Sequence, residues 1–254
     1  MKIDWTPVVD ELAHWRQAGL TLPIWWRDDD AIAPTPALDR LIALSEAVQV
    51  PVHLAVIPKT ATPELAMRVA DTDHLIPVVH GWAHQNLAPQ TAKKAEFGDT
   101  RDLAEVTQDV QNGLTRLQSL FGPRLKRMFV PPWNRIAPMH FPALTKAGYK
   151  TLSTYTPRNA PFAAQGLQQI NTHLDPINWR AGKTLIAPED LVAQLVTLMV
   201  DRRTGKTDND EPLGLLTHHL VHDADIWEFT RQLLEVLTSG PVTFTATLNE
   251  RRKP

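Results

Sequence analysis

Short apolar runs alternate with longer amphipathic segments from residue 22 almost to the end of the chain. Each short run has the length of a buried strand, and each longer segment repeats its apolar positions with the period of a helix. The pattern predicts strands at 23–28, 50–58, 74–80, 127–132, 151–155, 167–176, 213–219 and 242–248. It predicts helices between them at 35–48, 62–70, 101–122, 140–148, 188–202 and 224–240. This alternation is typical of β/α units arranged around a largely parallel sheet or barrel.

The segment before the first strand, residues 5–19, is predicted to form an amphipathic helix. Val8, Leu12 and Trp15 fall on one stripe of that helix. The polar stretch 202–212 is interpreted as an exposed loop. Because no internal repeat or linker divides the chain, we expect a single domain over residues 1–254, with the barrel at about residues 22–249.

Composition narrows the classes of partner. The 254 residues carry 26 basic and 28 acidic side chains, a net charge of −2, which provides no electrostatic footprint for DNA, RNA or an anionic membrane. No window is apolar enough to span a membrane, and the N-terminus lacks the apolar segment of a signal peptide. We therefore expect a cytoplasmic protein that binds neither nucleic acid nor membrane. The chain has no cysteine but ten histidines, so any metal must be bound by His, Asp or Glu.

Polar residues close several of the predicted strands. On parallel β/α folds the chemistry lies at the C-terminal ends of the strands, so these residues are candidates for one shared site. The segments in question read "RDDDA" at 27–31, "HGWAH" at 80–84, "VPPWN" at 130–134, "DPINW" at 175–179 and "LLTHH" at 215–219. Five distant segments would thus bring carboxylates, imidazoles and amides to one rim.

The pair His80 and His84 has a spacing that places both imidazoles on one face of a helical turn. Alone, this spacing fits a solvated turn as well as a metal site. Three adjacent carboxylates at the end of an aromatic strand repel one another unless a cation or an arginine compensates them, although acidic runs also occur as solvated caps. Two imidazoles and one carboxylate are a common catalytic ligand set for zinc, and a neighbouring carboxylate could then take a proton from the metal-activated water.

The five segments resemble, in the same order, the motifs of the polysaccharide deacetylase superfamily, also described as the NodB-homology or carbohydrate esterase family four fold. The motifs of that family are TFDDG, H(S/T)xxH, RPPxG, DxxDW and a hydrophobic run ending in His. The resemblance covers about residues 22–249 and implies an α/β fold, a distorted (β/α)7-type barrel.

The resemblance implies a metal site made of Asp30, His80 and His84, with Asp29 as the general base. The register within the acidic run leaves an alternative, in which Asp28 is the base and Asp29 the ligand. The implied ion is divalent, with Zn²⁺ as the first choice and Co²⁺, Ni²⁺ or Mn²⁺ as alternatives.

The same resemblance implies that His218, or else His219, is the general acid that protonates the leaving nitrogen. The backbone N–H of Trp133 would stabilise the oxyanion. The implied function is metal-dependent hydrolysis, through a metal-activated water, of an N-acetylated amino sugar or a related small-molecule or oligosaccharide substrate. A C–N hydrolase acting on a non-carbohydrate amide and a catalytically silent metal- or sugar-binding barrel are the alternatives.

Two departures from the family pattern affect the implied roles. Val130 stands where the family has the arginine that steadies the base, so Arg135 or Arg27 would have to supply that charge. Asn178 replaces the Asp that tunes the catalytic histidine, and Asp175 is the candidate to compensate. These departures favour the silent barrel slightly.

Aromatic residues in the motifs are candidates for a wall against a sugar ring, with Trp133 among them, although a Trp at a rim is as often a packing anchor. The loop after the HxxxH pair could bring further polar groups over the pocket, or it could be an exposed loop. The candidate substrate-binding residues are Trp82, Pro132, Trp179, Glu96 and Arg101.

Overall fold

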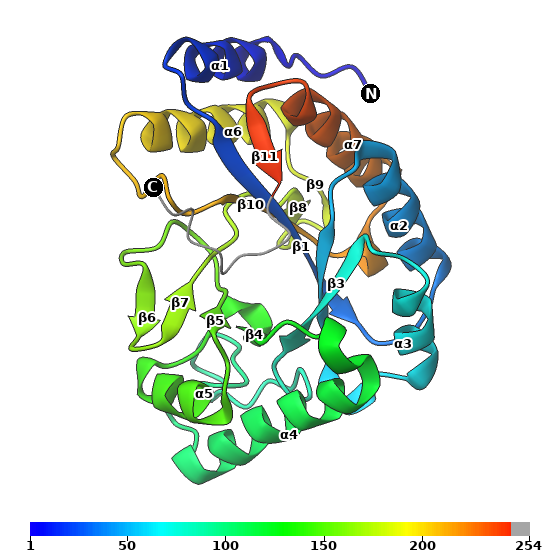
Figure 1. Ribbon diagram of the computed structural model, residues 1–254, viewed down its shortest axis with the longest axis vertical. Coiled ribbons are helices and arrows are strands. Elements are labelled where there is room, and N and C mark those ends of the chain that lie inside the picture. The colour runs from blue at the N-terminus through cyan, green and yellow to red at the C-terminus, as the bar shows by residue number, and fades with distance from the viewer. Residues whose placement is uncertain (245–254) are drawn as a thin grey trace.

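The computed structural model describes residues 1–244 and consists of a central sheet with helices outside it (Figure 1). The strands of the sheet are β1 (Leu22–Ala31), β2 (Val52–Val56), β3 (Leu75–His80), β4 (Met128–Val130), β5 (Thr151–Leu152), β6 (Phe162–Ala164), β7 (Leu167–Gln169), β10 (Leu213–Thr217) and β11 (Val242–Phe244). The helices are α1 (Thr6–Gln17), α2 (Pro36–Val48), α3 (Pro63–Ala70), α4 (Leu103–Phe121), α5 (Phe141–Ala147), α6 (Pro188–Arg203) and α7 (Ala224–Thr238). A separate hairpin pairs β8 (Ile177–Asn178) with β9 (Thr184–Leu185).

The strands of the sheet follow the order β10-β1-β2-β3-β4-β5-β7-β6, and β11 pairs with β1 as well. All neighbours are parallel except β6 and β7. The ladder of strands does not close within residues 1–244, but the two sides approach where Leu174 forms an isolated parallel bridge with Leu215. The predicted α/β class with a mostly parallel sheet is confirmed.

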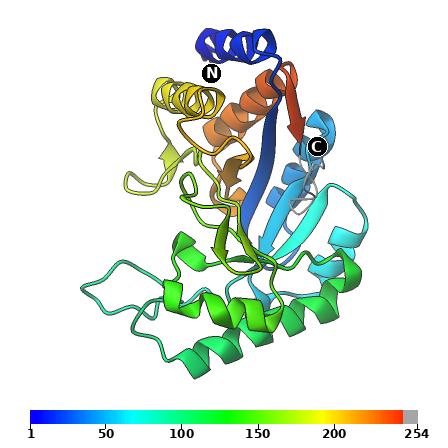
Figure 2. The same cartoon turned by 60° about the vertical axis from the view of Figure 1, so that its left-hand side comes forward.

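Figure 2 shows how the outer elements are distributed around this sheet. Helices α1 and α6 lie at one end of the molecule and α4 and α5 at the other. The long connection from β3 to α4 extends outward at the lower left of the second view. No helix in the described part of the chain combines the length and the apolar character that a membrane span requires.

Local signals in the sequence explain where several helices begin. Thr35 and Thr62 each cap a helix, because their hydroxyl oxygens accept the backbone N–H three residues later, and a proline follows each of them. Gly122 and Gly148 close α4 and α5 with φ values of 55° and 99°. The predicted first helix is confirmed, with Val8, Leu12 and Trp15 buried.

The strand predictions differ from the structure mainly at strand ends. The strand expected at 127–132 stops at Val130, because Pro131 and Pro132 have no backbone N–H for the ladder. The strand expected at 167–176 ends at Gln169, and the chain continues as an extended segment, 170–174, that reaches from β5 to β10. The predicted strand 242–248 is present as Val242–Phe244, and its remainder, with the end of the predicted barrel and domain, lies outside the described residues.

The two faces of β1 face different surroundings, since successive side chains of a strand point to opposite sides. Trp26 belongs to the large core between sheet and helices, together with residues such as Leu54 and Leu215. Trp25 belongs instead to a small inner cluster with Ala55, Val78, Met128, Val130 and Ile170. By the same alternation, Arg27 and Asp29 lie on the side of Trp25, and Asp28 lies on the side of Trp26.

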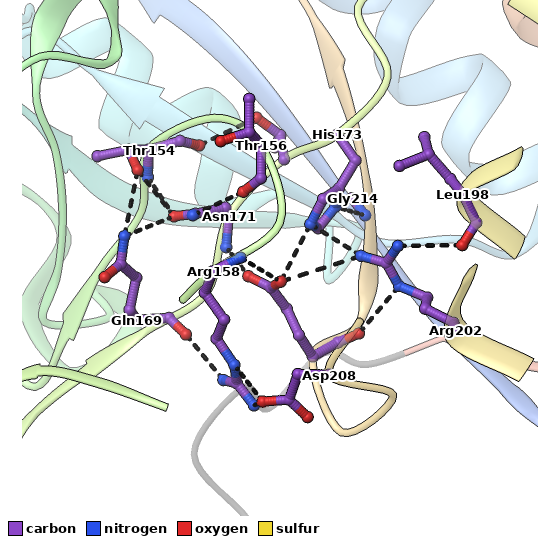
Figure 3. Close-up of polar contacts among 12 residues, drawn as sticks. Thr154, Thr156, Arg158, Gln169, Asn171, His173, Leu198, Arg202, Asp208 and Gly214 are labelled. Atoms are coloured by element: carbon purple, nitrogen blue, oxygen red, sulfur yellow. Dashed lines mark hydrogen bonds and ion pairs between the residues drawn. The ribbon is translucent and has the colours of Figure 1, made fainter. Parts of the chain in front are cut away.

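A buried polar network holds the start of β10 to segment 170–174 and to α6 (Figure 3). Glu211 accepts the backbone N–H groups of Arg158 and Asn171 and lies 3.2 Å from His173 Nε2. Arg202, from α6, places Nη2 2.8 Å from the same His173 nitrogen. The network therefore fixes the segment through which the two sides of the sheet meet.

Candidate metal centre

Asp30, His80 and His84 form a compact group at the carboxyl ends of β1 and β3. One ligand atom from each of the three lies within 4.8 Å of the others. Asp30 Oδ1 is 3.1 Å from His80 Nε2 and 3.2 Å from His84 Nε2. The three residues predicted as metal ligands are therefore brought together.

The orientation of the His80 ring suits a metal ligand. Its Nδ1 lies 3.0 Å from the backbone oxygen of Val130 and donates its proton there, which leaves the lone pair on Nε2 directed at the cluster. A backbone carbonyl in this position is a common outer partner of a metal-binding histidine. The donor set of two imidazoles and one carboxylate fits Zn²⁺ and leaves room for a fourth ligand.

Charge within the cluster shifts the pKa values of its members. Burial works to raise the pKa of Asp30, but the hydrogen bond and charge of His80 outweigh burial and lower it. Burial also works to lower the pKa of His80, yet Asp29 and Asp30 raise it above its ordinary value. The pKa of His84 is lowered by burial and by the charge of His80. The negative charge of the neighbouring carboxylates thus favours a cation at this site.

Unusual backbone conformations orient these side chains toward one another. Asp30 has φ 79° and lies within the register shift between Asp28 and Ala31 of β1 relative to β2, so its side chain leaves the alternation of the strand. Gly81 and His84 have φ values of 59° and 53° in the turn after β3. His80 ends a strand, as predicted, and an irregular turn carries His84, so the two imidazoles are not brought together by a helical turn.

Glu96 supports this turn from behind. Its carboxylate accepts the backbone N–H groups of Trp82, Ala83 and His84 at 2.7–3.3 Å, and burial raises its pKa. Arg101 in turn donates to the backbone oxygen of Glu96. Both residues were predicted to contact substrate. In the structure the Glu96 carboxylate holds the turn that carries His84, and Arg101 holds the backbone of Glu96 while pairing with Asp109.

Asp29 forms a bidentate ion pair with Arg27. The two oxygens of Asp29 accept from Arg27 Nε and Nη2 at 2.9 and 3.0 Å, and both side chains are buried. Arg27 also donates to Ser153 Oγ at 2.7 Å and to Asn134 Oδ1 at 2.6 Å. Arg27 therefore places a positive charge beside Asp29, where the family has an arginine at the position of Val130.

Arg135, the other arginine considered for this charge, lies elsewhere. It is exposed, and its Nη1 donates to the backbone oxygen of Lys94. Asp28, the base in the alternative register, contacts His219 and Thr217, and Asp30 is the aspartate that lies with His80 and His84. Ser153 was absent from the sequence-based site, because nothing in its local sequence indicates that it meets an arginine 126 residues away.

The predicted acid His218 lies half-buried after β10. The rings of His218 and Trp179 are 4.7 Å apart in an edge-to-face arrangement. Trp179 Nε1 donates to Asp175 at 2.8 Å. Asp175 is therefore linked to His218 indirectly, through the indole that contacts the His218 ring. Burial raises the pKa of Asp175, and the charge of His218 works against that rise. Asn178 uses its side-chain oxygen to cap the hairpin turn that follows it.

The remaining aromatic candidates divide into two groups. Trp133 has φ 55°, and its ring lies 4.5 Å from that of His84, so it borders the cluster. Trp82 packs against the core, and a Cβ on Gly81 would meet Pro132 at 2.6 Å, so Pro132 packs against the turn. Trp133 therefore borders the cluster and the exposed Trp179 borders His218, whereas Trp82 is partly buried against the core and Pro132 is buried.

No protein-family model and no curated protein matches the sequence. Solved structures do match it. A protein of Mycobacterium smegmatis described as a polysaccharide deacetylase is 18% identical, with a TM-score of 0.65 over 87% of this chain and 86% of that one. A family 4 carbohydrate esterase of Streptomyces lividans, in complex with acetate, is 13% identical, with a TM-score of 0.56 over 87% and 90% of the two chains.

A family 4 acetyl xylan esterase of Clostridium thermocellum, in complex with a cobalt ion, is 14% identical, with a TM-score of 0.53 over 88% of this chain and 87% of that one. At such identities these likenesses show the fold. The present chain has the fold of the polysaccharide deacetylases and family 4 carbohydrate esterases, and the resemblance predicted from the five motifs is confirmed at that level.

Proposed function

We propose that this chain, which has the fold of the polysaccharide deacetylases, is a metal-dependent hydrolase that removes the acetyl group from an N-acetylated amino sugar or a related small amide. One observation carries the proposal: the ligand atoms of Asp30, His80 and His84 lie within 4.8 Å of one another, next to a carboxylate held by a buried arginine. A carboxylate and a metal site side by side are what hydrolysis by an activated water requires.

The proposed cofactor is Zn²⁺, held by Asp30 Oδ1, His80 Nε2 and His84 Nε2. A divalent ion bound there would polarise the acyl oxygen and make a water molecule acidic enough to react near neutral pH. His80 is prepared for this role by the carbonyl of Val130, which fixes its tautomer. The turn that carries His84 is held by Glu96.

Asp29 is the proposed general base. The guanidinium of Arg27 donates to both of its oxygens, which fixes the plane of the carboxylate. As the water oxygen adds to the acyl carbon, Asp29 accepts the proton that the water loses. The backbone N–H of Trp133 is the proposed donor to the oxygen that becomes negative.

His218 is the proposed general acid. The C–N bond breaks as the nitrogen takes a proton from the His218 ring, so that acetate and a free amine leave. Trp179 packs edge-on against that ring and is itself held by Asp175. The indole of Trp179 is 45% exposed and would offer an apolar surface for a sugar ring beside the acid.

The test combines metal content with acetate release. Protein stripped with a chelator is reloaded with Zn²⁺, Co²⁺, Ni²⁺ or Mn²⁺, bound metal is measured by mass spectrometry, and acetate is measured with N-acetylglucosamine oligomers and with N-acetylated amides that lack a sugar. We expect Asp30→Ala to lose the metal. Asp29→Asn should keep the metal and lower kcat by about 10²- to 10⁴-fold.

Asp39→Asn is the matched control, because Asp39 is an exposed carboxylate paired with Arg68 on the surface. It should behave as the unchanged protein does. Failure of the unchanged protein to bind any of these ions at Asp30 would overturn the proposal, and so would metal binding without hydrolysis of any amide. Hydrolysis of the non-sugar amides alone would replace the substrate class and keep the chemistry.

A further inference from the structure

The third carboxylate of the acidic run, Asp28, contacts neither Arg27 nor the metal cluster. Its Oδ2 accepts the hydroxyl of Thr217 at 2.6 Å and the backbone N–H of His219 at 3.0 Å. Its Oδ1 lies 2.5 Å from His219 Nδ1. Three donors therefore converge on one carboxylate that is completely buried.

The alternation of β1 places Asp28 on the same side as Trp26, whose indole N–H donates to Thr217 Oγ1. On that side the short helix η5 (His219–Val221) packs against β1 and α2. A buried carboxylate is costly unless it is paired and hydrogen-bonded, so this contact is a specific one. Asp28 thus links η5 by hydrogen bonds to β1, the strand that carries Asp29 and Asp30.

The helix η5, which Asp28 links to β1, begins one residue after His218. Asp28 holds both the backbone N–H and the side chain of His219. The backbone N–H of His218 donates to His222 Nε2 at 3.3 Å, so the backbone of His218 and His219 is held at two successive amides. On the other side, the His218 ring contacts Trp179. The ring of His218 is consequently positioned from a backbone that Asp28 fixes.

We propose that Asp28 and His219 are a positioning pair, which sets the location of the His218 ring relative to the carboxylates at the end of β1. The inference rests on the proposed function in giving His218 a proton to donate. It assigns no proton transfer to His219, whose ring is 1% exposed and turned to Asp28 through Nδ1. A displacement of about 1 Å in a group that reacts can lower the rate about 10²-fold.

The test compares two substitutions at the same position. In His219→Asn the side-chain nitrogen is as many bonds from Cα as Nδ1 is, so it can still donate to Asp28. In His219→Ala that donor is gone. We expect His219→Ala and Asp28→Asn to lower kcat by about 10- to 100-fold with KM and bound metal little changed. His219→Asn should recover most of the kcat that His219→Ala loses.

His218→Asn is measured beside them, since it removes the proposed acid itself. Equal losses of kcat in His219→Asn and His219→Ala would overturn the proposal, because they would make the imidazole of His219 itself the required group. A change in KM and metal content without a fall in kcat would overturn it too, since that would make the pair a general structural contact.

A readout that needs no substrate separates this proposal from the proposed function. In protein labelled with ¹⁵N-histidine, the ring signals of His218 should shift in Asp28→Asn and in His219→Ala, while those of His80 and His84 stay. If no amide is hydrolysed by the unchanged protein, the shift still supports the positioning of His218. Unchanged His218 signals would overturn the proposal even if the protein proves to be a deacetylase.

Discussion

Three consecutive aspartates at the end of β1 have three different environments, and this explains how the fold tolerates three adjacent carboxylates. Asp28 points to the helix side and binds His219, Asp29 points inward and pairs with Arg27, and Asp30 is turned by a positive φ toward two histidines. Asp28 and Asp29 therefore have different partners, and Asp30 is turned away from both of them, which lowers the repulsion between adjacent carboxylates.

The pairing of Arg27 with Asp29 leads to a prediction for two arginines. Arg27→Lys keeps a positive charge but loses the bidentate fork, so Asp29 should be less well oriented. We expect kcat to fall about 10- to 100-fold while the bound metal, measured by mass spectrometry, stays at the level of the unchanged protein.

Arg135→Ala is the matched arginine variant, because that exposed side chain donates to the backbone oxygen of Lys94 and lies away from Asp29. It should retain kcat. A large loss of kcat in Arg135→Ala, or none in Arg27→Lys, would show that the charge near Asp29 has been assigned to the wrong arginine.

At the scale of elements, the turn between β3 and α4 decides whether His84 reaches the cluster. Gly81 begins this turn with φ 59°, and a Cβ there would come within 2.4 Å of Glu96 Oε2 and 2.6 Å of the Pro132 ring. Glu96 is the acceptor for three successive backbone N–H groups of the turn. The backbone at Gly81 and the carboxylate of Glu96 thus shape the metal site jointly.

Gly81→Ala tests this arrangement. The added methyl group would displace Glu96 and so release the turn, and we expect zinc affinity, measured by competition with a chelator, to fall about 10- to 100-fold. Gly166→Ala is the control, since Gly166 also has a positive φ of 76°, but among residues 1–244 an added Cβ would meet nothing within 4 Å beyond its chain neighbours.

Gly166→Ala should cost about 1–2 kcal/mol of folding stability, from the left-handed backbone alone, and leave zinc affinity unchanged. Equal zinc affinity in both glycine variants would contradict the role given to the turn.

At the scale of the whole molecule, the two sides of the sheet meet at segment 170–174. The network around Glu211 holds them together there, rather than a continuous ladder of strands. Arg202 and Glu211 are both buried, and burial lowers the pKa of Arg202 despite the charge of Glu211. The network joins α6, segment 170–174 and β10, which lie far apart in sequence (Figure 3). A large part of the molecule's stability should therefore depend on it.

Removing one partner from a buried ion network leaves the other charges uncompensated. Arg202→Met should therefore lower the free energy of unfolding, measured by urea denaturation, by about 3–5 kcal/mol. Arg68→Met removes an arginine from the pair with Asp39 at the surface and should cost less than about 1 kcal/mol. Similar costs for the two variants would contradict a stabilising role for the network.

Much of the architecture was predictable from the sequence, because it depends on local periodicity and on capping residues. The β/α alternation and the helix starts at Thr35 and Thr62 follow from such patterns, whereas the grouping of Asp30, His80 and His84 was implied by the resemblance to the deacetylase motifs. Strand ends were less predictable. The chain stays extended through 170–174 without forming the predicted strand, since its hydrogen bonds go partly to β5 and partly to β10.

The order of the motifs along the chain determined by itself which segments meet, since parallel strands bring their carboxyl ends to one edge of the sheet. Only the tertiary structure decided which side chains pair there. Arg27 rather than Arg135 pairs with Asp29, Glu96 accepts the backbone N–H groups of a turn, and Asp28 pairs with His219. The physical reason is that a sequence specifies the spacing of residues within a segment, whereas the distance between Asp28 and a histidine 191 residues away depends on how the strands and helices pack.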